Sequence, residues 1–368
     1  MHAADPSSQP PSDAAPAALG DTDLAIARSL PKVVLHDHLD GSLRPATLLD
    51  LLHRRGLEAP APDLATLVGW FDARAHAGSL VEYLRGFALT VAAMASPEGL
   101  SRVAFEAVQD AQADGCVLAE FRIAPLLFEP FGIAGEAAVE ALLDGLQRGQ
   151  AAFGLPCGLI VCAMRQEPGA RVARAAELAL RYQDRGVLAF DLAGPEAGHP
   201  ATDHAELLRS MLAQGLPLTL HAGEADAGWR VIEAARLGAR RVGHGVHFAD
   251  LLGTPEGPAL CDELRERGVH FEVCPTSNLH TGAARSIASH PIRPLWDAGL
   301  SLSFHPDNRL ISGVSMASEA LELRRALGFG WDELRRMGLA AADASFLPEA
   351  AKARARAALS VWCAPVAG

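Results

Sequence analysis

The sequence has no CxxC pair, no long apolar run and few aromatic residues. Its six cysteines follow no spacing typical of a disulfide framework, and most lie inside apolar stretches. They are Cys116, Cys157, Cys162, Cys261, Cys274 and Cys363. This pattern predicts reduced, buried thiols in a cytoplasmic protein. No run of about eighteen apolar residues is present, so we expect no membrane-spanning helix.

The sequence also lacks the pattern of a secretory signal at its N-terminus and an excess of basic residues. The first twenty residues, rich in Pro, Ala and Ser, lack the basic start and apolar centre of a secretory signal. We predict a disordered tail over residues 1–21 and a single domain over 22–368. Lys and Arg number 32 against 44 Asp and Glu, a net charge of −12. Neither nucleic acid nor an anionic membrane is therefore expected as a partner, and the oligomeric state stays open.

Short apolar stretches of strand-like length recur along the chain, separated by segments with helical periodicity. The predicted strands are 32–38, 117–125, 157–164, 187–194, 217–224, 240–245, 269–278 and 300–308. Nearly continuous apolar runs are typical of strands buried on both faces of a parallel sheet. Eight alternating strands and helices predict a (β/α)8 TIM barrel. Residues 45 to 116 exceed one crossover, so we expect extra helices inserted after the first strand.

Polar residues that could take part in catalysis or metal binding lie near the C-terminal ends of these strands. They are His36, His38, Glu120, Arg122, Asp191, His221, Glu224, His244 and Asp307. A closed barrel builds its active site at that face from several strand ends, whereas an open doubly wound sheet would place such residues at one switch point. The distribution favours the barrel.

The stretch "VVLHDHLDGSL" places His36, His38 and Asp40 in single alternation at the end of the first strand. Alternate strand residues share a face, so the three side chains are expected to point the same way. Two imidazoles at this spacing suit one divalent ion. Taken alone, the motif is equally consistent with histidines satisfied by ordinary hydrogen bonds.

Three later motifs add candidate ligands, each with a structural alternative. His221 precedes Glu224 in "LHAGE", His244 stands between glycines in "RVGHG", and Asp307 follows the last strand in "SLSFHPDN". Asp307 could instead cap the next helix. A barrel brings these ends around one axis, which makes several imidazoles and a carboxylate available to one ion. That ligand set favours zinc or a similar first-row metal, with a position left for water.

The motifs "LHDHLDGSL", "FDLAGPE", "LHAGE", "RVGHG" and "EVCPTSN", followed by the aspartate after the eighth strand, together resemble the adenosine deaminase family of zinc-dependent amidohydrolases. The resemblance spans roughly residues 30 to 345. It implies one Zn2+ per chain, bound by His36, His38, His221 and Asp307. It also implies a hydrolase acting on the C–N bond of a cyclic amidine, in purine metabolism.

The same resemblance implies three catalytic roles. Glu224 would give a proton to N1 of the purine while water attacks C6. His244 would position and polarise that water, and Asp307 would accept its proton. The substrates would be adenosine and 2′-deoxyadenosine, and the products inosine or 2′-deoxyinosine plus ammonia.

Four residues would contact the substrate. Asp40 would bind the ribose 5′-hydroxyl, with His38 near the same sugar, and the N–H of Gly194 would meet N3 of the base. Asn308 stands where many family members carry a second aspartate, as in a bacterial subgroup with an Asp-Asn-Arg variant, and its amide could donate to N7. His305 and Pro306 depart from the family pattern. His305 could either support the site from behind its ligands or face outward, and we favour the outward orientation.

Alternatives remain at this point. The substrate could be adenine or a 5′-modified adenosine such as aminodeoxyfutalosine or methylthioadenosine, although Asp40 favours a free 5′-hydroxyl. A non-catalytic nucleoside-binding protein would need a missing ligand or proton donor, and none is missing. A barrel hydrolase of ring amides would usually carry a lysine on strand four, and "FDLAG" has none.

Overall fold

The computed structural model describes residues 21–76 and 80–364, with side chains described for residues 22–76 and 86–364. Within this part of the chain, the eight predicted strands are confirmed. They are β1 Lys32–Val34, β2 Cys116–Ile123, β3 Cys157–Met164, β4 Val187–Ala193, β5 Thr219–Ala222, β6 Arg241–His244, β7 His270–Val273 and β8 Ser301–Phe304. Most end before the predicted boundary, because the polar residues that follow lie in loops.

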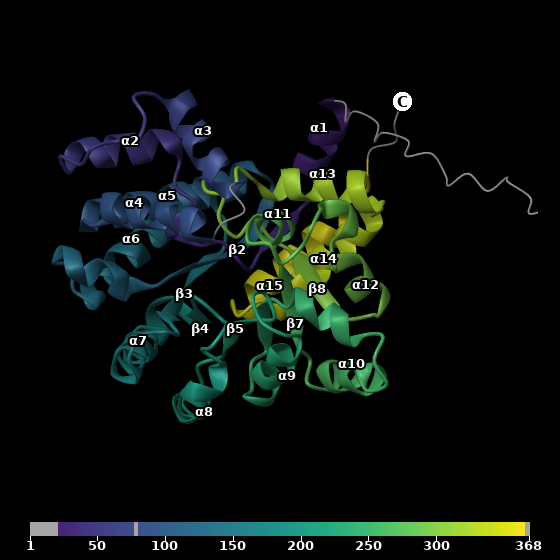
Figure 1. Ribbon diagram of the computed structural model, residues 1–368. Coiled ribbons are helices and arrows are strands. Elements are labelled where there is room, and N and C mark those ends of the chain that lie inside the picture. The colour runs from purple at the N-terminus through teal and green to yellow at the C-terminus, as the bar shows by residue number, and fades with distance from the viewer. Residues whose placement is uncertain (1–20, 77–79, 365–368) are drawn as a thin grey trace, which may run out of the picture.

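All strands are parallel and form two four-stranded sheets, in the orders β1-β2-β3-β4 and β5-β6-β7-β8. Single parallel bridges join the sheets on both sides: Phe190 pairs with Leu218, and Asp37 pairs with Asp307. The chain therefore forms a (β/α)8 barrel, and Figure 1 shows helices packed around the strands. The Asp37–Asp307 seam joins the first strand to the last, close to the candidate metal ligands.

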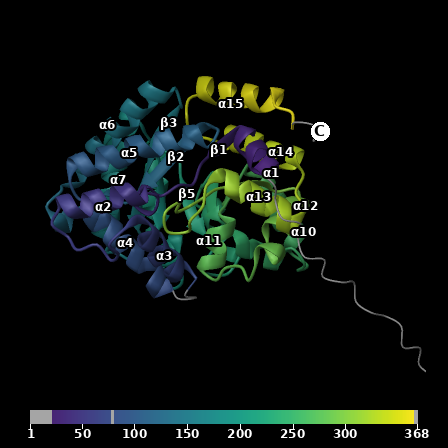
Figure 2. The same ribbon diagram turned by 90° about the horizontal axis from the view of Figure 1, so that it is seen from above.

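Helices connect successive strands and cover the barrel. Those after β2 are α6 Gly135–Phe153, α7 Gly169–Arg181, α8 Ala205–Ala213, α9 Trp229–Arg236, α10 Gly257–Glu266, α11 Pro275–His280, α12 Ile292–Asp297, α13 Met316–Leu327, α14 Trp331–Ala344 and α15 Glu349–Val361. Their apolar faces pack on strands that are themselves almost fully buried. Figure 2, seen from above, places α15 along one edge of the molecule.

The expected insertion after the first strand is confirmed. It contains α2 Pro45–Arg54, α3 Leu64–Ala75, α4 Leu80–Met94 and α5 Pro97–Ala113. The Ser96 side chain accepts a hydrogen bond from the backbone N–H of Gly99, which caps α5. The α2–α5 group gathers on one side of the barrel in Figure 1.

The ends of the chain bear on two predictions. Helix α1, Asp21–Ser29, begins at the predicted boundary, whereas the predicted disordered tail lies outside the described residues apart from Asp21. The single domain over 22–368 stays a prediction. None of the described helices combines the length and apolar character that a membrane crossing requires.

One expectation about orientation is wrong. The side chain of His305 is fully buried, not outward-facing. Its Nδ1 accepts a hydrogen bond from the backbone N–H of Leu35 at 3.2 Å, and its Nε2 lies 2.7 Å from Oγ of Ser303. His305 thus supplies a side-chain partner for the backbone directly after β1, at the seam between the first and last strands.

Candidate metal centre and active site

Three histidines and one aspartate converge at the C-terminal ends of β1, β5 and β8. Nε2 of His36 lies 3.2 Å from Oδ1 of Asp307, and Nε2 of His38 lies 3.5 Å from the same oxygen. Nε2 of His38 also lies 3.3 Å from Nε2 of His221. Donor atoms about 2.0–2.2 Å from one tetrahedral ion lie about 3.3–3.6 Å from one another. The spacing therefore fits a single ion.

Burial supports the same interpretation. His36 Nε2 is buried and has no hydrogen-bond partner, although Asp307 lies nearby. A buried ring nitrogen left without such a partner is costly unless something else contacts it. Burial also lowers the pKa of His38 well below its usual value, which keeps the ring neutral as a metal ligand must be. His36, His38, His221 and Asp307 could hold zinc.

Two carboxylates behind these rings fix their tautomers. Glu272 Oε2 lies 2.9 Å from Nδ1 of His36, and Asp191 Oδ2 lies 2.9 Å from Nδ1 of His221. A carboxylate accepts a hydrogen bond from Nδ1–H, which keeps the ring proton on Nδ1 and leaves Nε2 bare and free to face an ion. Both ligand histidines are therefore oriented before any metal binds.

Arg122 joins the two carboxylates beneath the site. Its Nη1 donates to Asp191 at 2.8 Å, and its Nη2 donates to Glu272 at 2.5 Å. All three side chains are fully buried. One guanidinium thus holds the orienting partners of His36 and His221 at a fixed separation.

Two site residues have a strained backbone. His244 has φ of +63° and Asp307 has φ of +60°, the two non-glycine residues with positive φ among those described. This left-handed region costs about 1–3 kcal/mol for such residues and concentrates at functional sites. Both occur where a strand ends, and the turn directs each side chain into the barrel mouth.

Glu224 lies beside this cluster on the loop after β5. Its Oε2 is 3.4 Å from Nε2 of His244, and its Oε1 accepts a hydrogen bond from Thr281 Oγ1 at 3.1 Å. Burial, followed by the nearby Asp307 carboxylate, raises the pKa of Glu224 to about 8. The carboxyl group is therefore protonated at neutral pH and able to donate.

The loop that carries Glu224 is held by a second carboxylate. Glu196 accepts hydrogen bonds from three consecutive backbone N–H groups, those of Gly223 at 2.5 Å, Glu224 at 3.0 Å and Ala225 at 2.9 Å. The Glu196 side chain is buried. These bonds fix the direction in which Glu224 leaves the backbone.

The residues expected to bind substrate lie nearby on other strand-end loops. Asp40 is on a short 3-10 turn, Leu39–Gly41, so it reaches the mouth by a turn and not by strand alternation. Burial raises the pKa of Asp40 to about 7, and its Oδ1 is buried without a hydrogen-bond partner. A Cβ placed on Gly41 would come within 2.0 Å of Oδ1 of Asn308. The turn that carries Asp40 therefore packs, through the backbone of Gly41, directly against the Asn308 side chain.

Gly194 directly follows β4 and has φ of +90°, and a Cβ there would lie 2.5 Å from Oε1 of Gln166. Only glycine fits this position without displacing its neighbour.

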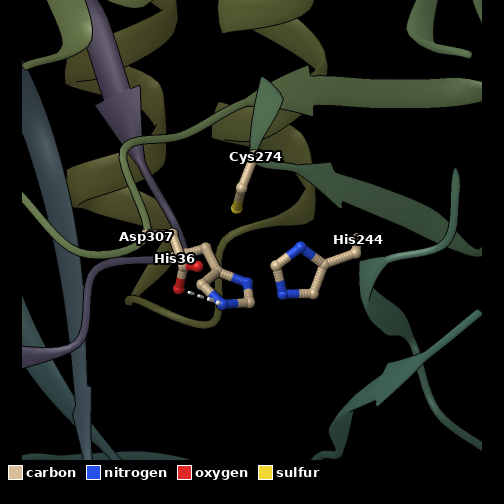
Figure 3. Close-up of side chains that lie close together, drawn as sticks. All are labelled: His36, His244, Cys274 and Asp307. Atoms are coloured by element: carbon tan, nitrogen blue, oxygen red, sulfur yellow. Dashed lines mark ion pairs between the residues drawn. The ribbon is translucent and has the colours of Figure 1, made fainter. Parts of the chain in front are cut away.

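Cys274 also points into the cluster, as Figure 3 shows together with His36, His244 and Asp307. Potential ligand atoms of these four residues lie within 4.8 Å of one another. Burial raises the pKa of the Cys274 thiol well above its usual value, and the thiol donates to the carbonyl of Glu272. The prediction of a buried thiol is confirmed.

Sequence reasoning assigned no role to the residues that orient these groups: Glu272, Arg122, Asp191, Glu196, Asn278 and Thr281. Glu272 could have been identified from the sequence, because a carboxylate within the apolar strand "HFEV" is expected to be buried and must then have a polar partner. Glu120 was expected at a strand end. It lies within β2 instead, and its Oε1 accepts from Ser345 and Phe346 before α15.

A (β/α)8 barrel with histidines and a carboxylate converging at its C-terminal face defines the class of metal-dependent barrel hydrolases. Comparison with known proteins narrows this class. The chain matches the family model described as adenosine deaminase over residues 31–361.

Individual proteins agree with that match. The adenosine deaminase of Mycobacterium bovis is 42% identical over 337 residues, which cover 88% of this chain and 92% of that protein. The adenosine deaminase of Mycobacterium avium is 42% identical over 342 residues, covering 89% and 93%. The chain therefore belongs to the adenosine deaminase family.

Solved structures are also similar. An amidohydrolase from Burkhoderia ambifaria with bound zinc has a TM-score of 0.83 and 26% identity, covering 95% of each chain. An N6-mAMP deaminase from arabidopsis has a TM-score of 0.78 and 26% identity, covering 91% of this chain and 98% of that one.

Proposed function

We propose that the protein is a cytoplasmic, zinc-dependent hydrolytic deaminase of adenosine and 2′-deoxyadenosine. The observation that carries the proposal is the largely buried carboxyl group of Glu224, 3.4 Å from His244 and beside a convergent set of three imidazoles and a carboxylate. The Mycobacterium relatives named adenosine deaminase support the same reaction. A small-molecule purine nucleoside is the expected partner, and the products are inosine or 2′-deoxyinosine and ammonia.

We assign one zinc ion to His36, His38, His221 and Asp307. When bound, zinc supplies a water molecule acidic enough to act as a nucleophile near neutral pH, since the pKa of such water falls to about 7. The zinc in the similar Burkhoderia structure supports this choice of metal.

The remaining residues act on the purine and the attacking water. Glu224, protonated at neutral pH, gives its proton to N1, which lowers the cost of breaking ring aromaticity at C6. Asp307 accepts a proton from the water. His244 orients that water by a hydrogen bond. Asn308 donates to N7, and the backbone N–H of Gly194 donates to N3.

Asp40 discriminates among possible substrates. Its partnerless buried oxygen suits a hydroxyl donor such as the ribose 5′-OH, and His38 lies near the same sugar. Adenine would leave that oxygen unsatisfied, and a thioether could not donate to it. A 5′-phosphate, as in the substrate named for the arabidopsis protein, would meet a carboxylate of like charge.

An ultraviolet assay of zinc-loaded protein tests the proposal with adenosine, 2′-deoxyadenosine, adenine, a 5′-modified adenosine and N6-methyl-AMP in parallel. Conversion of the first two alone is expected. Turnover only of one of the other three would retain deaminase chemistry and overturn the substrate. No turnover of any, with zinc bound, would overturn the function in favour of a nucleoside-binding protein.

A further inference from the structure

A chain of hydrogen bonds reaches His244 from outside the active site. The backbone N–H of Ile292 donates to Nδ1 of His290 at 3.0 Å, and Nε2 of His290 lies 3.3 Å from Oδ1 of Asn278. Nδ2 of Asn278 lies 3.0 Å from Nδ1 of His244. His290, Asn278 and His244 are all at most 1% exposed. We call His290 and Asn278 the relay pair.

The backbone N–H of Ile292 fixes which atoms donate and which accept along this series of hydrogen bonds. A backbone N–H can only donate, so Nδ1 of His290 must accept. Burial lowers the pKa of His290 to about 3, so the ring is neutral and carries its proton on Nε2. That proton goes to Asn278, whose facing atom must therefore be its carbonyl oxygen.

The amide orientation then determines the proton on His244. With its oxygen facing His290, Asn278 presents its NH2 group to Nδ1 of His244, which must accept. Neutral His244 consequently carries its proton on Nε2, the nitrogen that lies 3.4 Å from Oε2 of Glu224. Nε2 is a donor in this tautomer and has no lone pair with which to accept a proton.

We propose that Asn278 and His290 are positioning residues that hold His244 in its Nε2–H tautomer, so that His244 donates a hydrogen bond to the attacking water and does not act as its base. This inference rests on the proposed function for its catalytic meaning. Among the described residues, the side chains of the relay pair form no hydrogen bond with a candidate metal ligand or substrate-binding residue, and the pair acts through His244.

The local backbone supports a fixed relay. Helix α11 carries Asn278, and the residue just after it, Thr281, donates to Glu224. The carbonyl of Asn278 accepts from the backbone N–H of Ala284 at 2.9 Å. One short segment thus contacts both His244 and Glu224, the proposed water-orienting residue and the proposed proton donor.

The first test is Asn278→Asp, which keeps the size of the side chain and the acceptor for His290 but removes the donor to His244. Nitrogen-15 NMR of histidine-labelled protein, metal-free and zinc-loaded, reports the protonation of each ring nitrogen. The His244 signals are assigned by comparison with His244→Gln. We expect Nδ1 of His244 to be bare in the wild type and protonated in Asn278→Asp.

Kinetics of the same zinc-loaded variant provide a second readout. We expect kcat to fall about 10²–10⁴-fold, with KM within about threefold and zinc content unchanged. A protonated Nδ1 in the wild type, or an unchanged kcat in Asn278→Asp, would overturn the inference.

A matched pair at position 290 separates the relay from simple packing. Glutamine can donate from its amide to Asn278, whereas methionine of similar length cannot. We expect His290→Gln to retain a kcat at least fivefold above that of His290→Met, with similar thermal stability. Equal losses in both variants would assign His290 a purely structural role and overturn the relay.

The two proposals fail separately. If wild-type protein lacks deaminase activity, the proposed function fails, yet the NMR experiment still decides the tautomer. If wild-type protein deaminates adenosine normally and Asn278→Asp does the same, only the relay fails.

Discussion

Glu224 shows how one side chain acquires a function from its surroundings. Its carboxyl group sits between His244 and Thr281, on a loop held by Glu196, and it is deprived of most solvent. A carboxyl group in such a place remains protonated where an exposed one would ionise. This residue can therefore serve as a general acid at neutral pH.

The first prediction replaces that acid. Glu224→Gln preserves shape and the acceptor for Thr281 but has no acidic proton, so we expect kcat to fall about 10²–10⁴-fold. Zinc content and substrate affinity should be retained, since the metal donors are untouched. Steady-state kinetics with metal analysis checks this, and normal turnover would show that Glu224 is not the proton donor.

The second prediction concerns pH. Only protonated Glu224 can donate, and its pKa of about 8 means that the active form is present below pH 8 and lost above it. We expect kcat/KM, which reports the pKa values of the free enzyme, to decline as pH rises through about 8, by about tenfold per unit on the alkaline side. A kcat/KM that stays level to pH 10 would contradict this assignment. The residual activity of Glu224→Gln should lack this alkaline decline.

At the scale of elements, the turn after β1 and the loop after β8 are packed so closely that a glycine is required between them. A Cβ at Gly41 would overlap the Asn308 side chain, whereas a Cβ at Gly69 on α3 meets nothing within 4 Å. The position of Asn308 therefore depends on the absence of a side chain on a neighbouring element.

The third prediction uses this contrast. Gly41→Ala should displace Asn308 and lower kcat/KM for adenosine at least tenfold. Gly69→Ala is the matched control and should leave kinetics unchanged while raising stability by about 0.5–1 kcal/mol, because alanine favours helix. Both are checked by kinetics and thermal unfolding. Equal kcat/KM in the two variants would show that Asn308 tolerates the displacement or does not bind substrate.

The strand-end motifs allowed the barrel and a gathering of imidazoles and carboxylates at one face to be predicted, because parallel strands of a barrel bring these ends together. The choice of four metal donors and the role of Glu224 came from the family resemblance and stay predictions. His305 could not be placed in the same way. Its partner, the N–H of Leu35, lies across the seam between the first and last strands, and no local pattern indicates that contact. Residues that act through others, such as Glu272 and Asn278, were not identified for the same reason, since their partners His36 and His244 follow or lie on other strands.

At the scale of the whole molecule, the candidate ligands bridge the seam between the two sheets. His36 and His38 follow β1, whereas His221 and Asp307 belong to the other sheet. An ion bound by all four therefore links both halves of the barrel.

The fourth prediction follows from this link. Removal of zinc by a chelator should lower the melting temperature by several degrees. A ligand that binds only the folded state, present at a free concentration of about 1,000 times its Kd, stabilises that state by about 4 kcal/mol. Zinc should restore the melting temperature and magnesium should not, since imidazole ligands suit zinc. An unchanged melting temperature after verified metal loss would show that metal binding does not stabilise the barrel.

The same seam has a consequence for protein synthesis. His36 and His38 emerge from the ribosome early, and Asp307 emerges near the end, so a growing chain lacks a complete donor set until its last strand has been made and has closed against the first. Metal uptake is then a late event in biogenesis. A truncated translation product that stops before β8 would be inactive even if its early helices and strands had folded.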